Sequence, residues 1–176
     1  SFPTRRSSDL NASSSEPGPV ASSHFVENGI KDTVDEVPAY KVINGIPFFT
    51  RVWSQYDDGS LDSFTCDMYD ARAYLTDNGV TPEFLDDYGL NFGTYRRSGY
   101  IDEEGNETGG YTVKIWLQDS RAVAEEMKLI NKYNIAGVCA WRIGLETGPE
   151  IWEQISDALA EGTTAQPETA GTETGD

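Results

Sequence analysis

Histidine and cysteine, which often carry catalysis or bind metals, are scarce in this sequence of 176 residues. His24 is the only histidine, which excludes His-based catalytic triads and nearly every His-rich metal site. The two cysteines, Cys66 and Cys139, cannot build a disulfide framework, and no CxxC pair is present. Cys139 lies in the apolar run AGVCAW, which predicts a small buried side chain. We therefore expect neither a metal centre nor a cofactor.

The charge of the chain limits the partners that it could bind. Acidic residues outnumber basic ones by 30 to 13, which gives a formal net charge of −17. A surface this negative repels phosphate backbones and anionic lipids, so we expect no nucleic acid and no membrane as partner. Neutral ligands such as sugars are compatible with the charge, although acidity alone does not select them. No stretch of the sequence has the apolar length of a membrane span.

The hydrophobic pattern predicts an α/β domain. The order is helix, strand, an irregular excursion, helix, strand and helix, which is typical of parallel strands joined by crossover helices. Asp119 or Ser120 is expected to cap the helix of the second unit, and Trp152, Ile155 and Leu159 to face the core from the last helix. The expected helices are 23–37, 66–79, 119–134 and 149–162, and the expected strands are 41–53, 90–101, 111–118 and 135–144.

The composition of both ends of the chain indicates segments that lie outside the folded domain. The first ten residues, SFPTRRSSDL, correspond to one reading frame of a nucleotide string that resembles the end of a sequencing adapter. We expect residues 1–10 to be an artefactual segment, the alternative being a disordered Ser/Arg-containing arm. Residues 161–176 are rich in Thr, Gly and Glu, which predicts a disordered tail or linker.

Four segments, in order along the chain, resemble one family. KVINGIPFFTRVW carries the pattern G-[IVL]-P-[FL]-[YF]-x-R-x-W and resembles the seventh strand of glycoside hydrolase family 18, the chitinase-like (β/α)8 barrels. AGVCAWRIGLE resembles the eighth strand, which ends in a Trp, and YTVKIWLQDSRAVAEEMKLINKYN the stretch leading into it. SSSEPGPVASSHFVENGIKDTVDEVP resembles the loop and helix after strand six. The similarity is strongest to the bacterial spore-cortex and cell-wall branch.

The resemblance implies a partial TIM barrel. A whole barrel needs about 250 residues, so residues 11–160 would be its C-terminal part: the last two βα units, roughly strands seven and eight, with a small α+β insertion at about 54–115. The acidic family motif D-x-x-D-x-D-x-E of strand four, whose Glu is the general acid, does not occur in the sequence. Asp67 to Asp70, DMYD, is similar to a sixth-strand motif but has the wrong spacing and position. We expect it to be the first turn of a helix.

The resemblance also implies sugar-binding residues, and none of them is catalytic. Trp141 would lie under the sugar, where a flat indole covers the apolar face of a pyranose. Arg51 would line the cleft, or form a structural ion pair. Phe49 stands where many relatives have Tyr, so stacking is kept and a hydrogen bond is lost. Trp53 would extend the aromatic cleft or pack a loop, and Glu146 would be an acid at the mouth or a solvated cap.

Three hypotheses follow. The first is a fragment of a glycosidase that hydrolyses β-1,4 bonds next to N-acetylglucosamine in chitin-like or peptidoglycan glycans, by a substrate-assisted retaining mechanism. The chain alone would be inactive, and its parent would be secreted or associated with a bacterial cell wall or spore. The second is a non-catalytic, lectin-like family 18 relative that binds the same glycans. The third is an independent acidic α/β interaction module, which would fold cooperatively alone.

Overall fold

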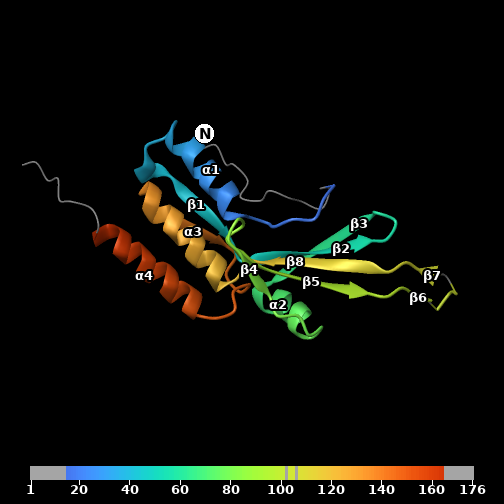
Figure 1. Cartoon of the computed structure of the whole chain (residues 1–176). Helices are drawn as coiled ribbons and strands as arrows, with labels where there is room; N and C mark the ends of the chain where they lie inside the picture. Colours follow the sequence, from blue (N-terminus) through green and yellow to red (C-terminus); the bar gives the residue numbers. More distant parts are fainter. Residues whose placement is uncertain (1–14, 102, 106, 165–176) are drawn as a thin grey trace, which may run out of the picture.

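The computed structural model describes residues 15–101, 103–105 and 107–164. The segment 1–10 that we expect to be artefactual therefore lies outside the described residues. Figure 1 shows two parts: helices α1, α3 and α4 are grouped at one end around a short strand, and a longer sheet with α2 extends from them. The described elements are α1 (Ser23–Val34), a 3-10 turn (Ala39–Lys41), β1 (Ile43–Pro47), β2 (Phe49–Tyr56), β3 (Leu61–Asp67), α2 (Met68–Thr76), β4 (Glu83–Leu85), β5 (Leu90–Arg97), β6 (Tyr100–Ile101), β7 (Glu107–Thr108), β8 (Tyr111–Leu117), α3 (Ser120–Tyr133), β9 (Gly137–Trp141) and α4 (Glu150–Thr164).

A pair of parallel strands forms the centre of the first part. β1 and β9 pair in parallel from Ile43 with Gly137 to Pro47 with Trp141. The helix α3 precedes β9 and α4 follows it, so the expected order of parallel strands and crossover helices is present. A core of apolar side chains from α1, α3 and α4 covers one face of the pair. The members of this core include Val26, Ile30, Ile46, Phe48, Val123, Met127, Ile130, Ile151 and Ile155.

The apolar run 41–53, which we expected to be one strand, is two strands in two sheets. Phe48 separates them: its backbone N–H donates to the carbonyl of Trp141 at 2.7 Å, which is the last contact of the chain with β9. From Phe49 the chain pairs instead with β3 and β8. The five-stranded sheet therefore begins at Phe49, before the boundary expected at about residue 54, because a change of partner between two apolar strands leaves no mark in the local sequence.

The second part is an antiparallel sheet in the order β3-β2-β8-β5-β4. The predicted hairpin partners 90–101 and 111–118 are confirmed, since β5 pairs with β8 from Asn91 with Leu117 to Arg97 with Tyr111. One face of the sheet packs against α2 through Val52, Val113, Ile115 and Leu117. Gly93 allows this close contact, because a Cβ there would lie 2.6 Å from the Leu75 side chain.

The expected side-chain directions in β9 and α4 need two corrections. Cys139 is exposed and not buried. Successive residues of a strand face opposite sides, so Val138 and Ala140 join the core while Cys139 and Trp141 face the side that no described helix covers. In α4, Ile151 is fully buried and Trp152 is 37% exposed, so the inward face begins one residue earlier than expected. The helix also continues to Thr164, and so includes the first residues of the predicted tail.

Candidate functional site

The ends of β1 and β9 come together at one edge of the parallel pair. Pro47 lies opposite Trp141, and the Phe48 amide closes the edge through the Trp141 carbonyl. The Trp141 side chain is 69% exposed, and the peptide bond that follows it is cis. The carboxyl ends of parallel strands are where α/β folds place ligands. Trp141 therefore offers a flat aromatic surface at the position expected of a binding site.

Glu146 organises the loop that follows Trp141. Its Oε2 accepts from the Gly144 backbone N–H at 2.6 Å, and its Oε1 accepts from the Trp152 indole Nε1 at 3.0 Å. The hydrogen bond from Trp152 is the main cause that lowers the pKa of this carboxyl. The Leu145 carbonyl accepts from the Met68 N–H at 3.0 Å, which joins the same loop to α2. One carboxylate oxygen is thus engaged within the loop and the other by α4, which is the cap role that the sequence left open.

The sequence predicted Arg51 and Phe49 in the same strand as residues 43–47. The structure places both in β2, the strand that follows β1. The guanidinium of Arg51 donates through Nη1 to the Ser63 hydroxyl at 2.9 Å and lies 5.7 Å from the Trp53 ring. No described carboxylate pairs with it, and its buried Nε has no hydrogen-bond partner. Burial lowers the pKa of the guanidinium. Phe49 is half-buried at the start of β2, on the same side of the strand as Arg51.

Trp53 is a packing residue. Its side chain is 1% exposed, and its indole Nε1 donates to the Gly18 carbonyl at 2.8 Å. The loop before α1 therefore covers the ring and satisfies its only donor. The prediction that Trp53 could extend an aromatic cleft is wrong for this structure, and the alternative of loop packing describes its contacts.

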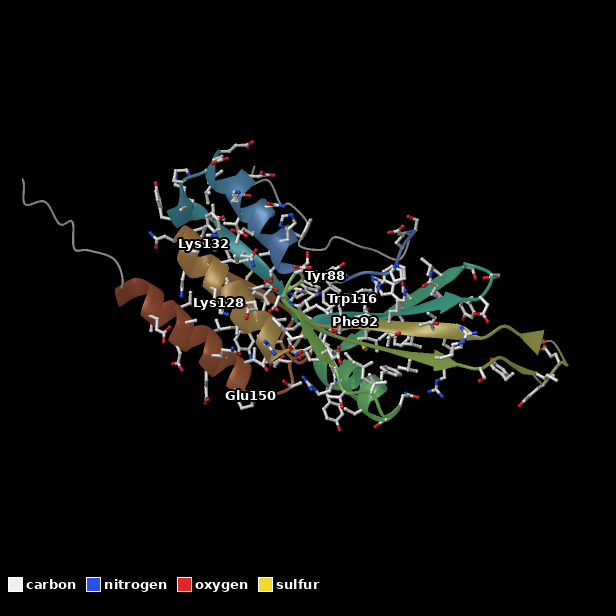
Figure 2. The ribbon with its side chains drawn as sticks, in the orientation of Figure 1. Tyr88, Phe92, Trp116, Lys128, Lys132 and Glu150 are labelled. Atoms are coloured by element: carbon white, nitrogen blue, oxygen red, sulfur yellow. The ribbon has the colours of Figure 1, made fainter. Side chains whose placement is uncertain are left out.

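Three aromatic side chains, Tyr88, Phe92 and Trp116, form a group at the end of the sheet next to the helices. Trp116 lies 4.7 Å from Phe92 and 6.3 Å from Tyr88, ring centre to ring centre, and Figure 2 shows the three side chains together where the sheet meets the helices. The buried Trp116 Nε1 has no hydrogen-bond partner. These contacts give Trp116 a packing role. Across residues 15–101, 103–105 and 107–164, no group of three His, Cys, Asp or Glu could hold a metal ion.

Known proteins with similar sequences or folds are glycosylases and chitinases. No family model matches the chain. It is 25% identical over 148 residues to the "Putative sporulation-specific glycosylase YdhD" of Bacillus subtilis and 23% identical over 133 residues to the "Cortical fragment-lytic enzyme" of the same organism. A chitinase from Chromobacterium violaceum superimposes on 88% of the chain with a TM-score of 0.66 and 27% identity. The family GH18 chitinase of Cycas revoluta covers the same share with a TM-score of 0.65 and 13% identity. The chain is thus similar in sequence to bacterial spore glycosylases and in fold to chitinases, a family GH18 chitinase among them.

The chain matches only part of these relatives. It spans 32% of the sporulation-specific glycosylase and 28% of the cortical fragment-lytic enzyme, and 44% of the chitinase from Chromobacterium violaceum. The spore cortex-lytic enzyme SleL of Bacillus cereus shares the fold over 87% of the chain, with a TM-score of 0.69 and 18% identity. Over the described residues, no helix has the length and apolar character needed to cross a bilayer.

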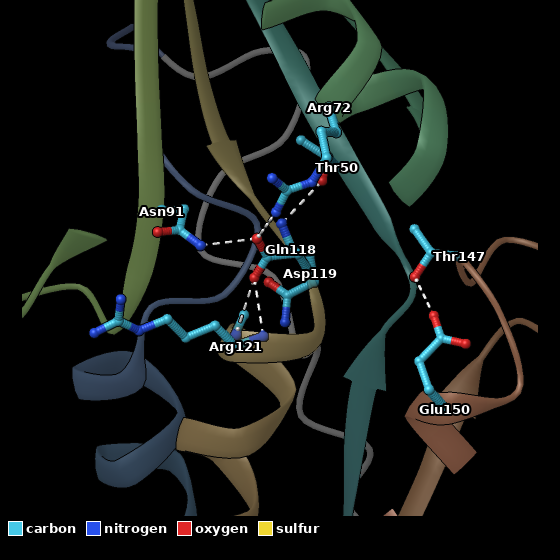
Figure 3. Close-up of polar contacts among 9 residues, drawn as sticks. Thr50, Arg72, Asn91, Gln118, Asp119, Arg121, Thr147 and Glu150 are labelled. Atoms are coloured by element: carbon cyan, nitrogen blue, oxygen red, sulfur yellow. Dashed lines mark hydrogen bonds and ion pairs between the residues drawn. The ribbon is translucent and has the colours of Figure 1, made fainter. Parts of the chain in front are cut away.

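Sequence analysis identified only part of the polar network that holds the fold together. Asp119 was expected as a helix cap, and its Oδ1 does accept from the first backbone amides of α3. Its Oδ2 also accepts from Arg72 of α2 and from Asn91 of β5, each at 2.8 Å (Figure 3). One buried carboxylate thus ties three elements together. The partners are 47 and 28 residues away in sequence, so no local pattern could have found them.

Replacing Asp119 by alanine is expected to lower the free energy of unfolding by roughly 2–4 kcal/mol. The change removes an N-cap, about 1 kcal/mol, and leaves the Asn91 amide and the Arg72 guanidinium without their acceptor. Asp67→Ala is the matched control, because Asp67 caps α2 through the Asp70 amide alone and should cost about 1 kcal/mol. Urea unfolding monitored by circular dichroism measures both. Equal losses would show that the two additional partners of Asp119 contribute nothing.

Proposed function

We propose that β1 and β9 are the seventh and eighth strands of a (β/α)8 barrel, and that the chain is the C-terminal part of a glycosidase. The observation that carries the proposal is Trp141, exposed at the carboxyl end of β9 on the face opposite the helices. In a barrel that face is turned to the interior, and the carboxyl ends of the strands surround the active site. The small sheet from Phe49 to Leu117 is then the insertion that follows strand seven.

The parent protein would hydrolyse β-1,4 bonds next to N-acetylglucosamine in a chitin-like or peptidoglycan glycan, associated with a bacterial cell wall or spore. The names of relatives support both glycans, since they include chitinases and spore cortex-lytic enzymes. In the substrate-assisted route, the N-acetyl oxygen of the sugar attacks the anomeric carbon while a carboxylic acid protonates the leaving oxygen. This acid belongs to the motif D-x-x-D-x-D-x-E, which does not occur in the 176 residues. The chain by itself is therefore expected to bind glycan without cleaving it.

The residues of this chain would contribute contact and position. Trp141 would stack against the apolar face of one sugar, and Glu146 would fix the loop beside it through Gly144 and Trp152. Phe49 and Arg51 would contact the glycan from the sheet, Arg51 donating to sugar oxygens. Trp53 has no part in the site.

Replacing Trp141 by alanine is expected to weaken binding of an N-acetylglucosamine oligosaccharide at least about tenfold, which is ~1.4 kcal/mol. The indole supplies the stacking surface, and nothing else at the end of β9 is flat and apolar. Isothermal titration of the tetrasaccharide into both chains measures the change. Tyr40→Ala is the control, because Tyr40 is equally exposed, at 70%, but precedes the opposite end of β1. Equal affinities of the Trp141 variant and the parent chain would overturn the proposed site.

The open face of the strand pair predicts how the chain behaves alone. Ile43, Trp141 and Ile143 are 60%, 69% and 78% exposed, and each strand of the pair has one unpaired edge. Exposed apolar surface beside free strand edges favours association, so size-exclusion chromatography should show concentration-dependent oligomers. A monomer with a sharp two-state melt would contradict the barrel fragment and favour an independent α/β module.

A non-catalytic relative would use the same Trp141 platform without the acid. DNA sequencing distinguishes the glycosidase from the non-catalytic relative. It should cover the codon of Asn11 and about 200 codons upstream, enough for the rest of a barrel. An upstream strand that ends in D-x-x-D-x-D-x-E indicates an enzyme, and the same strand with its Glu replaced indicates a lectin-like protein.

A further inference from the structure

A carboxyl group is buried at the junction between the two parts of the molecule. Glu126 of α3 is 2% exposed. Its Oε1 accepts from Nε2 of Gln118 at 2.7 Å, and its Oε2 accepts from Nδ2 of Asn44 at 3.2 Å. Asn44 belongs to β1 and Gln118 directly follows β8, so this one side chain bridges the parallel pair and the five-stranded sheet.

The bridge continues into the strand that carries Arg51. The backbone N–H of Gln118 donates to the hydroxyl of Thr50 at 3.0 Å, and both residues are buried. Thr50 and Gln118 stand where the chain enters and leaves the sheet. Glu126 therefore holds Gln118, at the end of β8, next to β1 by direct hydrogen bonds. It holds Thr50, at the start of β2, through Gln118.

The bridge is made by an acid that no cation balances. Several charged groups of the surrounding elements pair elsewhere: Glu27 of α1 with Lys132, Asp119 with Arg72, and the neighbouring Glu125 with Lys128. Only the amides of Gln118 and Asn44 face the Glu126 carboxyl, and burial dominates over their hydrogen bonds and raises its pKa to about 8. An ionised Glu126 would be a desolvated charge, which draws in water or moves out of its site.

We propose that Glu126 is a positioning residue: as the neutral acid it clamps the five-stranded sheet to the β1–β9 pair, and its ionisation loosens that attachment. The clamp determines where Phe49 and Arg51 lie relative to Trp141. This consequence for glycan binding rests on the proposed function, whereas the clamp itself does not.

The attachment can be measured with two spin labels. Cys139 is exposed on β9 and serves as one label site, Ser98→Cys just after β5 is the other, and Cys66→Ser removes the remaining thiol. Double electron–electron resonance on the full chain, diluted with unlabelled chain, gives the distance distribution between the two parts. The compared chains are the parent, Glu126→Gln, Glu126→Leu and the control Glu125→Gln, each at pH 6 and pH 9.5.

We expect a narrow distribution for the parent at pH 6 and one about twice as wide at pH 9.5. Glu126→Gln offers one accepting oxygen and one donor group, as the neutral acid does, and stays narrow at both values once one facing amide turns its oxygen toward that donor. Glu126→Leu fills the space without the hydrogen bonds and is wide at both values. Glu125→Gln behaves as the parent. A parent distribution that does not change with pH, or a Leu variant as narrow as the parent, would overturn the proposal.

Titration of the N-acetylglucosamine tetrasaccharide separates this proposal from the glycan site. If the clamp is right and the glycan site is right, affinity falls at pH 9.5 in the parent and not in Glu126→Gln. If the distance distributions respond as expected but no chain binds the tetrasaccharide at pH 6, the clamp stands and the proposed function fails.

Discussion

Replacing Phe48 by alanine should lower the free energy of unfolding by about 3–5 kcal/mol, the largest effect expected of any single change in this chain. Phe48 is fully buried in the core of the first part and meets the ring of Trp152 edge-on at 5.2 Å. Its backbone also marks the place where the chain leaves β1 for β2. Truncation would therefore open a cavity between the parallel pair and α4, at the position where the two sheets join.

Phe64→Ala supplies the matched control for this change. Phe64 lies in β3, is 44% exposed and touches Tyr74 at the margin of α2, so the same truncation should cost less than about 1 kcal/mol. Urea unfolding followed by circular dichroism, at dilutions where the chain is monomeric, measures both. A loss below about 1 kcal/mol for Phe48→Ala would mean that the junction is not part of the cooperative core.

The second large effect is a loss of stability with rising pH that originates at Glu126. Its pKa is raised from 4.5 to about 8 by burial, so between these values the folded chain holds a proton that the unfolded chain has released. Stability then falls as pH rises and levels off above the folded pKa. The fall from pH 5 to pH 8 should be roughly 3–4 kcal/mol from this group.

Glu126→Gln should remove this slope, because an amide cannot release a proton. Its free energy of unfolding is expected to change little from pH 5 to pH 8 and to exceed that of the parent at pH 8. Glu125→Gln, whose carboxyl pairs with Lys128 in solvent, should keep the parent slope. Urea titrations at five pH values decide the matter. Parallel pH profiles for the parent and Glu126→Gln would show that the buried acid is not coupled to folding.

The parts of the fold that depend on local pattern were predictable. Asp119 begins α3 as its sequence indicates, and the alternation in 111–118 places Val113 and Ile115 under α2. The hydrophobic pattern supplied the order of the elements. The resemblance to family 18 placed Trp141 at the end of its strand, although no sequence pattern measures the exposure of that side chain.

The parts that depend on distant partners were not predictable. A continuous apolar run conceals both the break at Phe48 and the alternation that exposes Cys139. Trp53 and Trp141 look alike in sequence, yet the loop before α1 buries the first and nothing described covers the second. Glu126 occupies an inward helical position where an apolar residue is typical, and only the amides of Asn44 and Gln118 explain it.

The hydrogen bond between Thr50 and Gln118 has a consequence for how such a molecule can change over time. It joins the start of β2 to the residue that follows β8, so the two ends of the segment from Phe49 to Leu117 lie side by side, next to β1 and α3. A segment attached in this way behaves as a cassette. Lengthening it, shortening it or exchanging it for another would alter the surface beside Trp141 while β1 and β9 kept their register.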